Sequence, residues 1–383
     1  MTFPLPIPPE LRRRLAPGTG VLLGLSGGVD SAVTLALLRA LGCDVQCVTF
    51  KNFCYGEDDR FTDRSCCSLD AIAAARRLAA RFAAPHWVGD VEAPFRGQVI
   101  EPFVAEYRAG RTPNPCLQCN SQVRFPELVR LAGRQGCALA ATGHYARVAV
   151  DDRGARLQCG LDPAKDQSYF LHRIDRGLWP QLVFPLGWYT KDEVRRAARE
   201  LDIPVADKPD SQEICFVPDD DRAFLFPDGA GTGEGAIVDG AGRELGRHRG
   251  LVHYTVGQRR GLGLAAAEPL YVLALDAEAN RLVVGPQAEL AVDRLEADRF
   301  VAAVPGLPAE GPGPQTGAVT VRIRHRHAGA RVRSWRIEGE RVLVELEETV
   351  GGAAPGQGLV LYAGDTVLGG GRLLAASRRQ EAG

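Results

Sequence analysis

Apolar and polar positions divide the chain into two regions. From residue 20 to about residue 215, short apolar runs alternate with stretches of helical periodicity. After about residue 215 the helical periodicity stops, and Val- and Leu-rich runs recur roughly every 8–12 residues between Gly-rich turns. The first pattern is typical of strand–helix–strand units that form a parallel sheet, and the second is typical of an all-β region.

The first region can be divided into elements. Its apolar runs predict strands over residues 20–25, 44–50, 86–91 and 138–141 and a hairpin over residues 145–160. Helical periodicity and start signals predict helices over residues 32–41, 68–84, 94–109 (broken at Pro102), 121–135 and 190–201, the last opened by a Thr190–Glu193 capping box. Residues 111–120 (RTPNPCLQCN) are predicted to form a loop because they contain two prolines.

These patterns predict an α/β fold followed by an all-β part. We expect an N-terminal parallel-sheet domain over residues 1–215, a central small β domain over 216–286 and a C-terminal β-barrel over 287–383. The break between the two β domains is placed near Gly285-Pro286.

Residues 20–31 (GVLLGLSGGVDS) carry the strongest chemical signal. A short apolar strand, a Gly-Gly turn and a helix start directly follow one another, so backbone N–H groups and a helix N-terminus point at one place and form an anion site. The loop is not a Walker A motif, because no lysine follows the glycines. Asp30 would repel a phosphate unless it holds a cation such as Mg²⁺.

Composition limits the functions that the chain can have. The 383 residues carry a net charge of −1, so a nucleic-acid-binding surface must be a local basic patch. No apolar run reaches the length of a membrane span or of a signal-peptide core, and the 10 cysteines lack the spacing of a secreted domain. We expect a cytoplasmic protein without a membrane partner, a monomer, with its cysteines as thiols.

The cysteines fall into two groups. Cys116 and Cys119 form a CxxC in the Pro-rich segment, and Cys215 lies in DSQEICF at the junction of the two regions, so these thiols are candidates for chemistry. The thiols expected to be inert parts of the core are Cys43, Cys47, Cys137 and Cys159.

Six motifs together resemble a known family. They are SGGVDS, RTPNPCLQCN, ATGHYAR (141–147), KDQSYFL (165–171), DSQEICF (210–216) and HRGLVHYTVGQRRGLG (248–263), and PGQ follows at 355–357. In this order they resemble the bacterial tRNA-specific 2-thiouridylases, and SGGVDS alone resembles the pyrophosphate-binding loop (PP-loop) of ATP pyrophosphatases.

The resemblance implies an enzyme that uses ATP to adenylate O2 of the wobble uridine in tRNA and then replaces that oxygen with sulfur. It implies that Cys119 is the nucleophile and Cys215 the persulfide carrier, and attack of one thiol on the persulfide would leave a disulfide. The partners implied are a tRNA with a wobble uridine and a sulfur-donor protein, either a cysteine desulfurase or a persulfide relay.

Cys116 departs from the family pattern, because many members carry Asp there. Cys116, Cys119 and Cys215 could instead bind three irons of a 4Fe–4S cluster and leave the fourth iron open for sulfide. A zinc site helped by Cys66 and Cys67 is a further alternative, although adjacent cysteines chelate one ion poorly.

The resemblance also assigns binding residues. ATP contacts fall on Gly24, Leu25, Ser26, Gly27, Gly28, Val29, Asp30, Ser31, Phe50 and Gly143. The flipped target base would be received by Asn114, Pro115 and Cys116, and further tRNA contacts fall on His144, Lys165, Asp166, Gln167, Arg324, His325 and Gln357. Arg322, Arg324 and Arg326 alternate, which predicts a basic stripe on one face of a strand.

Two other functions remain open from the residues. One is another PP-loop ATP pyrophosphatase, such as an amide or argininosuccinate-type synthetase, which does not need the paired cysteine segments. The other is a non-catalytic RNA-binding protein that retains the loop.

Overall fold

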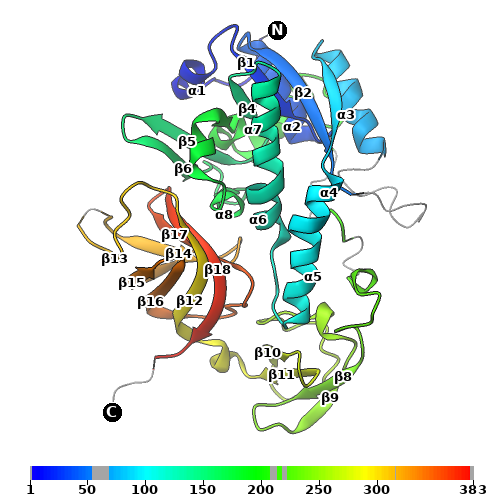
Figure 1. The fold of residues 1–383 in the computed structure, drawn as a ribbon, viewed down its shortest axis with the longest axis vertical. Coiled ribbons are helices and arrows are strands. Elements are labelled where there is room, and N and C mark those ends of the chain that lie inside the picture. The colour runs from blue at the N-terminus through cyan, green and yellow to red at the C-terminus, as the bar shows by residue number, and fades with distance from the viewer. Residues whose placement is uncertain (1, 54–68, 208–213, 218–221, 315, 380–383) are drawn as a thin grey trace. The chain divides into compact units, whose positions relative to one another are not determined.

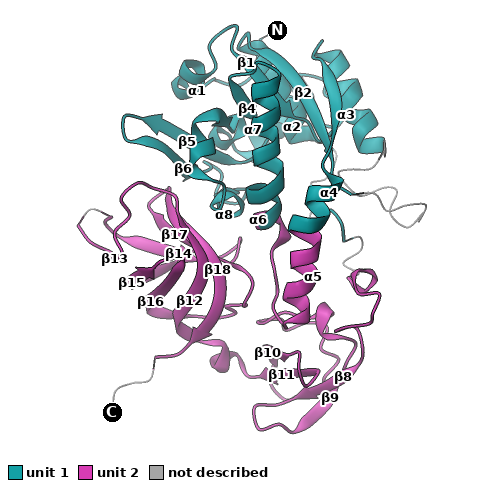
Figure 2. Cartoon of the chain, in the orientation of Figure 1, with its two compact units in different colours: residues 1–98, 118–219 teal, residues 99–117, 220–383 magenta. Residues whose placement is uncertain are grey.

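The computed structural model describes residues 2–53, 69–207, 214–217, 222–314 and 316–379. Cys54, Cys66, Cys67 and much of the DSQEICF motif lie outside the described residues. The chain divides into two compact units (Figure 2). Unit 1 comprises residues 1–98 and 118–219, and unit 2 comprises residues 99–117 and 220–383.

Unit 1 is built on a five-stranded parallel sheet. Its strands are β1 (Gly20–Gly24), β2 (Asp44–Lys51), β3 (His86–Asp90), β4 (Leu139–Ala141) and β7 (Leu182–Val183), in the order β3-β2-β1-β4-β7. The pairs β1–β2, β2–β3, β1–β4 and β4–β7 are all parallel, which confirms the predicted sheet. The predicted hairpin is also confirmed as β5 (Ala146–Asp151) and β6 (Gly154–Cys159).

Helices cover both faces of this sheet (Figure 1). Alternate residues of β1, Val21 and Leu23, join one core with α2 (Val29–Ala40), α3 (Leu69–Arg81) and α9 (Lys191–Glu200). On the other face, α7 (Phe125–Arg134) contacts β1 and β4. The shorter helices of this unit are α1 (Pro9–Arg14), α4 (Glu92–Phe95) and α8 (Ser168–Leu171). The predicted capping box of Thr190 and Glu193 opens α9.

Two sequence-based element predictions were wrong in part. Residues 115–119 form helix α6 (Pro115–Cys119) rather than loop, because a proline is tolerated at the first helical position. A π-helical turn, Asn120–Arg124, then joins α6 to α7. The break in the helix predicted over 94–109 also precedes Pro102: α4 is followed by a π-helical turn, Arg96–Ile100, and then by α5 (Glu101–Arg108).

Unit 2 contains a small sheet and a barrel. The small sheet has the order β10-β11-β8-β9, formed by Tyr271–Asp276, Arg281–Gly285, Gly235–Val238 and Glu244–His248. The barrel comprises β12 (Val292–Ala302), β16 (Arg341–Val350), β15 (Ala330–Glu338), β14 (Val319–Arg322), β17 (Gly358–Ala363) and β18 (Thr366–Ser377) in that order. Pairing of β12 with β18 closes it, and the short β13 (Glu310–Gly311) pairs with β15.

The barrel core follows the strand period of two. In β16, Val342, Val344 and Leu346 are buried, and the residues between them are more exposed. The all-β character predicted for this half of the chain is confirmed, whereas the domain boundaries at 215 and 286 stay a prediction. Among the described residues, no helix is long and apolar enough to cross a membrane.

Candidate functional site

The carboxyl ends of β1 and β4 are the switch point of the sheet in unit 1. β1 pairs with β2 on one side and with β4 on the other, so the strand order reverses direction there, and sheets of this type bind ligands outside the carboxyl ends of such strands. We call this place the crevice. The two loops that border it approach closely, because a Cβ added at Gly143 would lie 2.9 Å from the backbone carbon of Asp30 and 3.0 Å from the nitrogen of Ser31. A side chain larger than hydrogen at residue 143 would collide with the start of α2.

The loop between β1 and α2 is shaped by its own polar groups. The Ser26 backbone N–H donates to Ser31 Oγ (3.2 Å), and Ser31 Oγ donates to the Gly28 carbonyl (3.1 Å). Gly27 has φ +74°, and a Cβ there would lie 2.7 Å from the Ala71 carbonyl of α3. Gly28 precedes α2 directly and has no such collision. The backbone is therefore not crowded beside Gly28 at the N-terminus of this 12-residue helix, as phosphate binding there would need.

Asp30 has partners that sequence reasoning missed. Lys191 Nζ donates to both carboxylate oxygens, at 2.7 and 2.9 Å, and the Tyr145 hydroxyl donates to Oδ1 at 2.8 Å. The Lys191 side chain is only 7% exposed and the Asp30 side chain 31%. Lys191 is the first residue of α9, and the only sequence signal for it was its place after the capping residue Thr190.

The arrangement of Asp30, Lys191 and the glycine turn is better suited to a nucleotide phosphate than to a metal ion. The glycine turn, the helix N-terminus and the Lys191 ammonium are all suited to negative charge. The Asp30 carboxylate is already neutralised by Lys191, so it does not fit the role of a direct Mg²⁺ ligand in this conformation.

The other expected ATP contacts lie along the same edge of the sheet. Gly24 ends β1 facing Thr142, Leu25 donates its backbone N–H to the Val48 carbonyl, and Val29 is buried at the first position of α2. Phe50 is half-buried near the end of β2.

His144 lies beside the crevice as a neutral ring. Its Nδ1 hydrogen-bonds with Thr142 Oγ1 at 2.7 Å, and the ring packs against Phe125 and Phe184. Burial, together with the Arg124 charge, lowers the pKa of His144 to about 3. An imidazole in this environment can stack or hydrogen-bond, but it does not supply a positive charge at neutral pH.

The 165–167 triplet organises its own turn. Asp166 is buried and accepts hydrogen bonds from the backbone N–H groups of Gly160 and Ser168, both at 3.0 Å. Gln167 is bonded to Tyr145 twice: its side-chain oxygen accepts from the Tyr145 N–H (2.9 Å), and its own N–H donates to the Tyr145 carbonyl (2.8 Å). The triplet is therefore linked to Asp30 through Tyr145.

The candidate cysteines Cys116, Cys119 and Cys215 are free thiols in the structure. Cys119 is buried at the end of α6, whereas Cys116, three residues earlier, is exposed. The neighbours of Cys119 are anchored to the α8 region, because Arg173 donates to Gln118 Oε1 (3.3 Å) and Asn120 Nδ2 donates to the Phe170 carbonyl (3.1 Å).

Cys215 is half-buried, and the residue after it, Phe216, packs edge-on against Phe95 of α4.

Three of the cysteines expected to be inert, Cys43, Cys47 and Cys137, are buried. Burial raises the pKa of each thiol, to about 11 for Cys43 and about 12 for Cys47. Cys159 is half-buried.

No three or more His, Cys, Asp or Glu side chains among the described residues are arranged to hold a metal ion.

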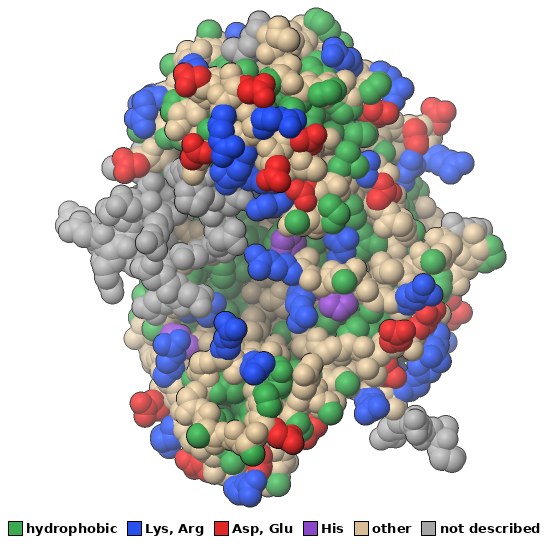
Figure 3. Space-filling view, turned by 180° about the vertical axis from the view of Figure 1, so that it is seen from behind, with side chains coloured by type: hydrophobic (Ala, Val, Ile, Leu, Met, Phe, Trp, Pro, Cys, Tyr) green, Lys and Arg blue, Asp and Glu red, His purple; other side chains and the backbone are tan. Residues whose placement is uncertain are grey.

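The predicted arginine stripe is wrong as a strand face. β14 ends at Arg322, whose guanidinium stacks on the Tyr362 ring, and the chain then turns, with the His327 N–H donating to the Arg324 carbonyl. Arg324 and Arg326 are exposed on this turn, and His325 is half-buried. The period-two argument failed because it assumed that the strand continued. Figure 3 shows Lys and Arg interspersed with Asp and Glu on the face it presents.

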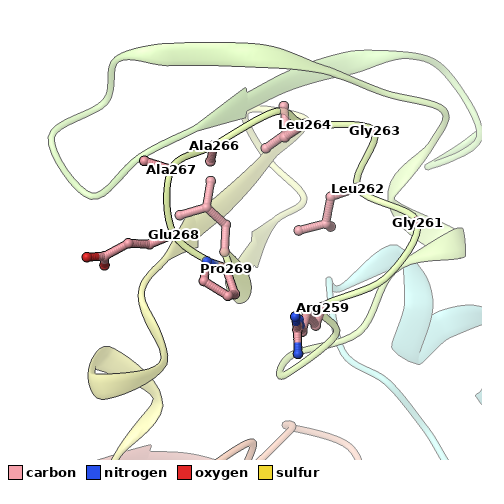
Figure 4. Close-up of a pocket in the computed structure, with 10 residues that line it drawn as sticks. Arg259, Gly261, Leu262, Gly263, Leu264, Ala266, Ala267, Glu268 and Pro269 are labelled. Carbon is pink, nitrogen blue, oxygen red and sulfur yellow. The ribbon is translucent and has the colours of Figure 1, made fainter.

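A cavity of about 390 Å³ in unit 2 is lined by residues of the segment 259–270 (Figure 4). Its lining is mostly Gly, Ala and Leu, and Glu268 points away from the other labelled side chains. It offers no set of nucleophile, base and charge comparable to the crevice of unit 1.

Comparisons with known proteins cover nearly the whole chain. Family models match in three consecutive blocks: a tRNA methyl transferase HUP domain over residues 19–219, a tRNA methyl transferase PRC-barrel domain over 225–286 and an aminomethyltransferase beta-barrel domain over 302–373.

Similar curated proteins share one description. The chain is 44% identical over 364 residues to the tRNA-specific 2-thiouridylase MnmA of Geobacter metallireducens, which covers 93% of this chain and 97% of that protein. It is 46% identical over 377 residues to the protein of the same name from Rhodospirillum rubrum, with 94% and 97% covered. For that of Acidithiobacillus ferrooxidans the identity is 43% over 357 residues, with 91% and 97% covered.

Proposed function

This chain belongs to the tRNA-specific 2-thiouridylase family, and from that premise we propose that it adenylates O2 of the wobble uridine of tRNA with ATP and replaces that oxygen with sulfur. The observation that carries the proposal is the crevice between β1 and β4. There Gly143 meets the start of α2 so closely that only glycine fits, and Lys191 adds a cation at the same point.

In the adenylation step, the nucleotide phosphates lie on the N-terminus of α2. Uridine O2 attacks the α-phosphorus, the bond to the β-phosphate oxygen breaks, and pyrophosphate leaves. The backbone N–H groups of Gly27 and Gly28 donate to the developing charge, and these two glycines let the backbone approach without a Cβ. Asp30 holds Lys191 in place through its two hydrogen bonds.

The sulfur step uses the two candidate thiols. A donor protein loads Cys215 as a persulfide; the Cys119 thiolate attacks the Cys215 sulfur, the S–S bond breaks, and hydrosulfide leaves as the Cys119–Cys215 disulfide forms. Hydrosulfide adds to C2 of the adenylated uridine and AMP departs with the former O2, giving 2-thiouridine. A dithiol reductant then restores both thiols.

The remaining partners follow from this chemistry. The flipped uridine is received beside Cys119 by Asn114, Pro115 and Cys116. The exposed Arg324 binds an RNA phosphate. A cysteine desulfurase or a persulfide relay supplies the sulfur, and the enzyme works as a monomer in the cytoplasm. ATP enters with Mg²⁺, and the sulfur step above needs only the two thiols and the donor protein.

The test is mass spectrometry of tRNA nucleosides after incubation of unmodified tRNA with the enzyme, ATP, Mg²⁺, a persulfide donor and dithiothreitol. We expect 2-thiouridine at the wobble position and equal amounts of AMP and pyrophosphate. Release of AMP only with a free amino acid or amide acceptor would favour another PP-loop synthetase, and tRNA binding without AMP release would favour an RNA-binding protein.

Cysteine variants separate the two halves of the reaction. Cys119→Ser and Cys215→Ser should each abolish 2-thiouridine and keep ATP binding. Cys137→Ala is the matched control, since Cys137 is buried at 7% exposure as Cys119 is at 5%, and it should keep full activity. Full thiolation by Cys215→Ser would contradict the persulfide role. Colourless, iron-free and fully active protein would exclude the cluster.

A further inference from the structure

Three consecutive residues of unit 2, Gly110, Arg111 and Thr112, precede the segment proposed to receive the base. The segment itself begins only two residues later, where Asn114 Oδ1 accepts from the Cys116 N–H (3.2 Å) and opens α6. Gly110 and Thr112 contact parts of unit 2 that lie far away in sequence, and Arg111 is joined to such a part through Glu106. Since they stand immediately before the segment, whatever holds them also sets where it starts.

Thr112 has the most contacts of the three. Its N–H donates to the Pro355 carbonyl (2.8 Å), and its carbonyl accepts from the Gln357 side chain (2.8 Å). Its hydroxyl accepts from Thr255 Oγ1 (2.8 Å). The backbone and side chain of Thr112 are thus both satisfied by residues at least 143 positions away.

The turn that holds Thr112 connects β16 to β17, over residues 351–357. Gly356 in this turn has φ +95°, and a Cβ there would lie 2.9 Å from the carbon and oxygen of Thr112. The turn and the Thr112 backbone are therefore in close contact, without space for a methyl group.

Arg111 and Gly110 extend the attachment. Arg111 donates to both oxygens of Glu106 (2.6 and 3.0 Å), and Glu106 also accepts from Arg372 of β18, which pairs with Asp298 of β12. Gly110, at φ +70°, packs so closely on β10 that a Cβ would lie 2.8 Å from the Leu275 carbonyl. The end of α5 is thus tied both to the barrel and to the small sheet.

The same β16–β17 turn also contacts the exposed turn that carries Arg324 and Arg326. A Cβ at Gly352 would lie 3.0 Å from a guanidinium nitrogen of Arg324, and one at Gly257 would lie 3.1 Å from Gly352 Cα. Residues 351–357 therefore contact Arg324 at one end and Thr112 at the other. A phosphate bound at Arg324 and a base received next to Asn114 would share this one element.

We propose that the β16–β17 turn is a positioning element for the base-receiving segment and that Gln357 is a positioning residue, which acts through the Thr112 carbonyl rather than by touching RNA. The proposal rests on the proposed function in one respect, because its kinetic measurement is the rate of uridine thiolation. It replaces the direct tRNA contact that the family resemblance assigns to Gln357. The barrel then contributes to the reaction by fixing where residues 113–116 stand, in addition to binding RNA.

The test is hydrogen–deuterium exchange of the peptide covering residues 111–117 in the full chain, without substrate, together with tRNA affinity and thiolation kinetics. In Gln357→Ala and in Gln357→Glu, whose carboxylate cannot donate, we expect exchange in this peptide to rise roughly fivefold, as loss of one hydrogen bond implies. The kcat for thiolation should fall on the order of tenfold, because misplacing reacting groups slows the chemistry, while Kd for tRNA changes less than twofold.

Two controls separate positioning from general damage. Gln287→Ala removes an exposed glutamine of the same unit and should change neither exchange nor kcat. Gly356→Ala should act like Gln357→Ala but more strongly, whereas Gly364→Ala, with φ +57° and no atom within 4 Å, should leave the 111–117 peptide unchanged. Thermal unfolding of each variant reports any loss of the barrel fold.

Unchanged exchange in residues 111–117 in both Gln357 variants would overturn the proposal. So would a loss of tRNA affinity with kcat unchanged at saturating tRNA, since that split belongs to a direct RNA contact. If the unaltered enzyme forms no 2-thiouridine at all, the proposed function fails, but the exchange experiment still decides whether the turn fixes the segment.

Discussion

The nucleotide crevice of unit 1 and the anchored residues 110–112 of unit 2 are both shaped by backbone groups packed without room for a side chain. They differ in how far apart in sequence their parts lie. The crevice takes most of its shape from one stretch, residues 20–31, in which strand, turn and helix follow directly. In residues 110–112, Thr112 is held by Thr255, Pro355 and Gln357 instead.

The comparison shows that a short stretch of sequence can form the backbone shape of a candidate binding site, whereas residues from distant parts of the sequence fix its position and supply its charges. The crevice itself follows this rule. Its glycine turn is local, but the cation that neutralises Asp30 comes from Lys191, 161 positions away. In unit 2 nothing local fixes Thr112, because residues 111–114 have no regular secondary structure.

The largest effect is expected at Lys191. Lys191→Met leaves the Asp30 carboxylate without its cation beside the phosphate site, and pyrophosphate release should fall on the order of 100-fold, as it does when one preorganised charge is removed. The measurement is pyrophosphate formation with saturating tRNA and ATP. The double variant Asp30→Asn/Lys191→Met should be more stable than Lys191→Met, because it buries no unpaired carboxylate, but it should not recover activity. A Lys191→Met enzyme with normal turnover would show that residues 20–31 are sufficient for the reaction at the crevice.

The next effect separates shape from binding within the loop. Gly27→Ala forces a positive φ and a collision with the Ala71 carbonyl, and should cost about 2 kcal/mol of unfolding free energy. Gly28→Ala, at φ −95° and with no close atom but Ser26 Oγ at 3.6 Å, should keep the fold and weaken ATP binding. Urea unfolding and ATP titration measure both. Equal destabilisation by the two would refute the distinction.

A pH effect of intermediate size is expected at His172 of unit 1. Burial lowers the pKa of His172 to about 3, and its Nδ1–H donates to the Tyr169 carbonyl at 2.7 Å. The unfolded chain binds a proton below about pH 6.5 that the folded chain does not, so stability is full above that pH and is lost as pH falls, by up to about 1.4 kcal/mol per pH unit.

The measurement is urea unfolding followed by tryptophan fluorescence at pH 7.5, 6 and 5. His172→Gln should flatten the decline between pH 6.5 and 5, and an unchanged decline would assign the acid sensitivity to other groups. His144, with its pKa also lowered to about 3, contributes in the same direction.

The smallest effect is expected at the exposed turn of unit 2. Arg324→Ala should weaken tRNA binding a few-fold and lower the slope of log K against log salt by about 1, as loss of one phosphate contact does. Arg324→Lys should keep the slope. Arg331→Ala, which removes an exposed arginine of β15 that pairs with Glu347, is the control and should leave binding unchanged. Affinities measured at several salt concentrations by filter binding decide this.

Individual residues show how much of the fold and of the candidate site could be predicted from the sequence. The parallel strands, the capping box at Thr190 and the glycine turn were predictable, since each depends on neighbours within a few positions. The helix at Pro115–Cys119 was missed because proline was taken as a helix breaker and not as a first helical residue. The stripe from Arg322 to Arg326 failed because nothing in its alternation marks where β14 ends.

The sequence by itself determined the order of the elements, the glycine turn after the first strand and the identity of the candidate thiols, because periodicity, glycine and cysteine chemistry are properties of short segments. Only the tertiary structure decided that Lys191 and Tyr145 meet Asp30 and that Gln357 meets Thr112. Such contacts form when distant segments are brought together by burial of the sheet and barrel cores, and no local pattern records which polar groups will then stand within hydrogen-bonding distance.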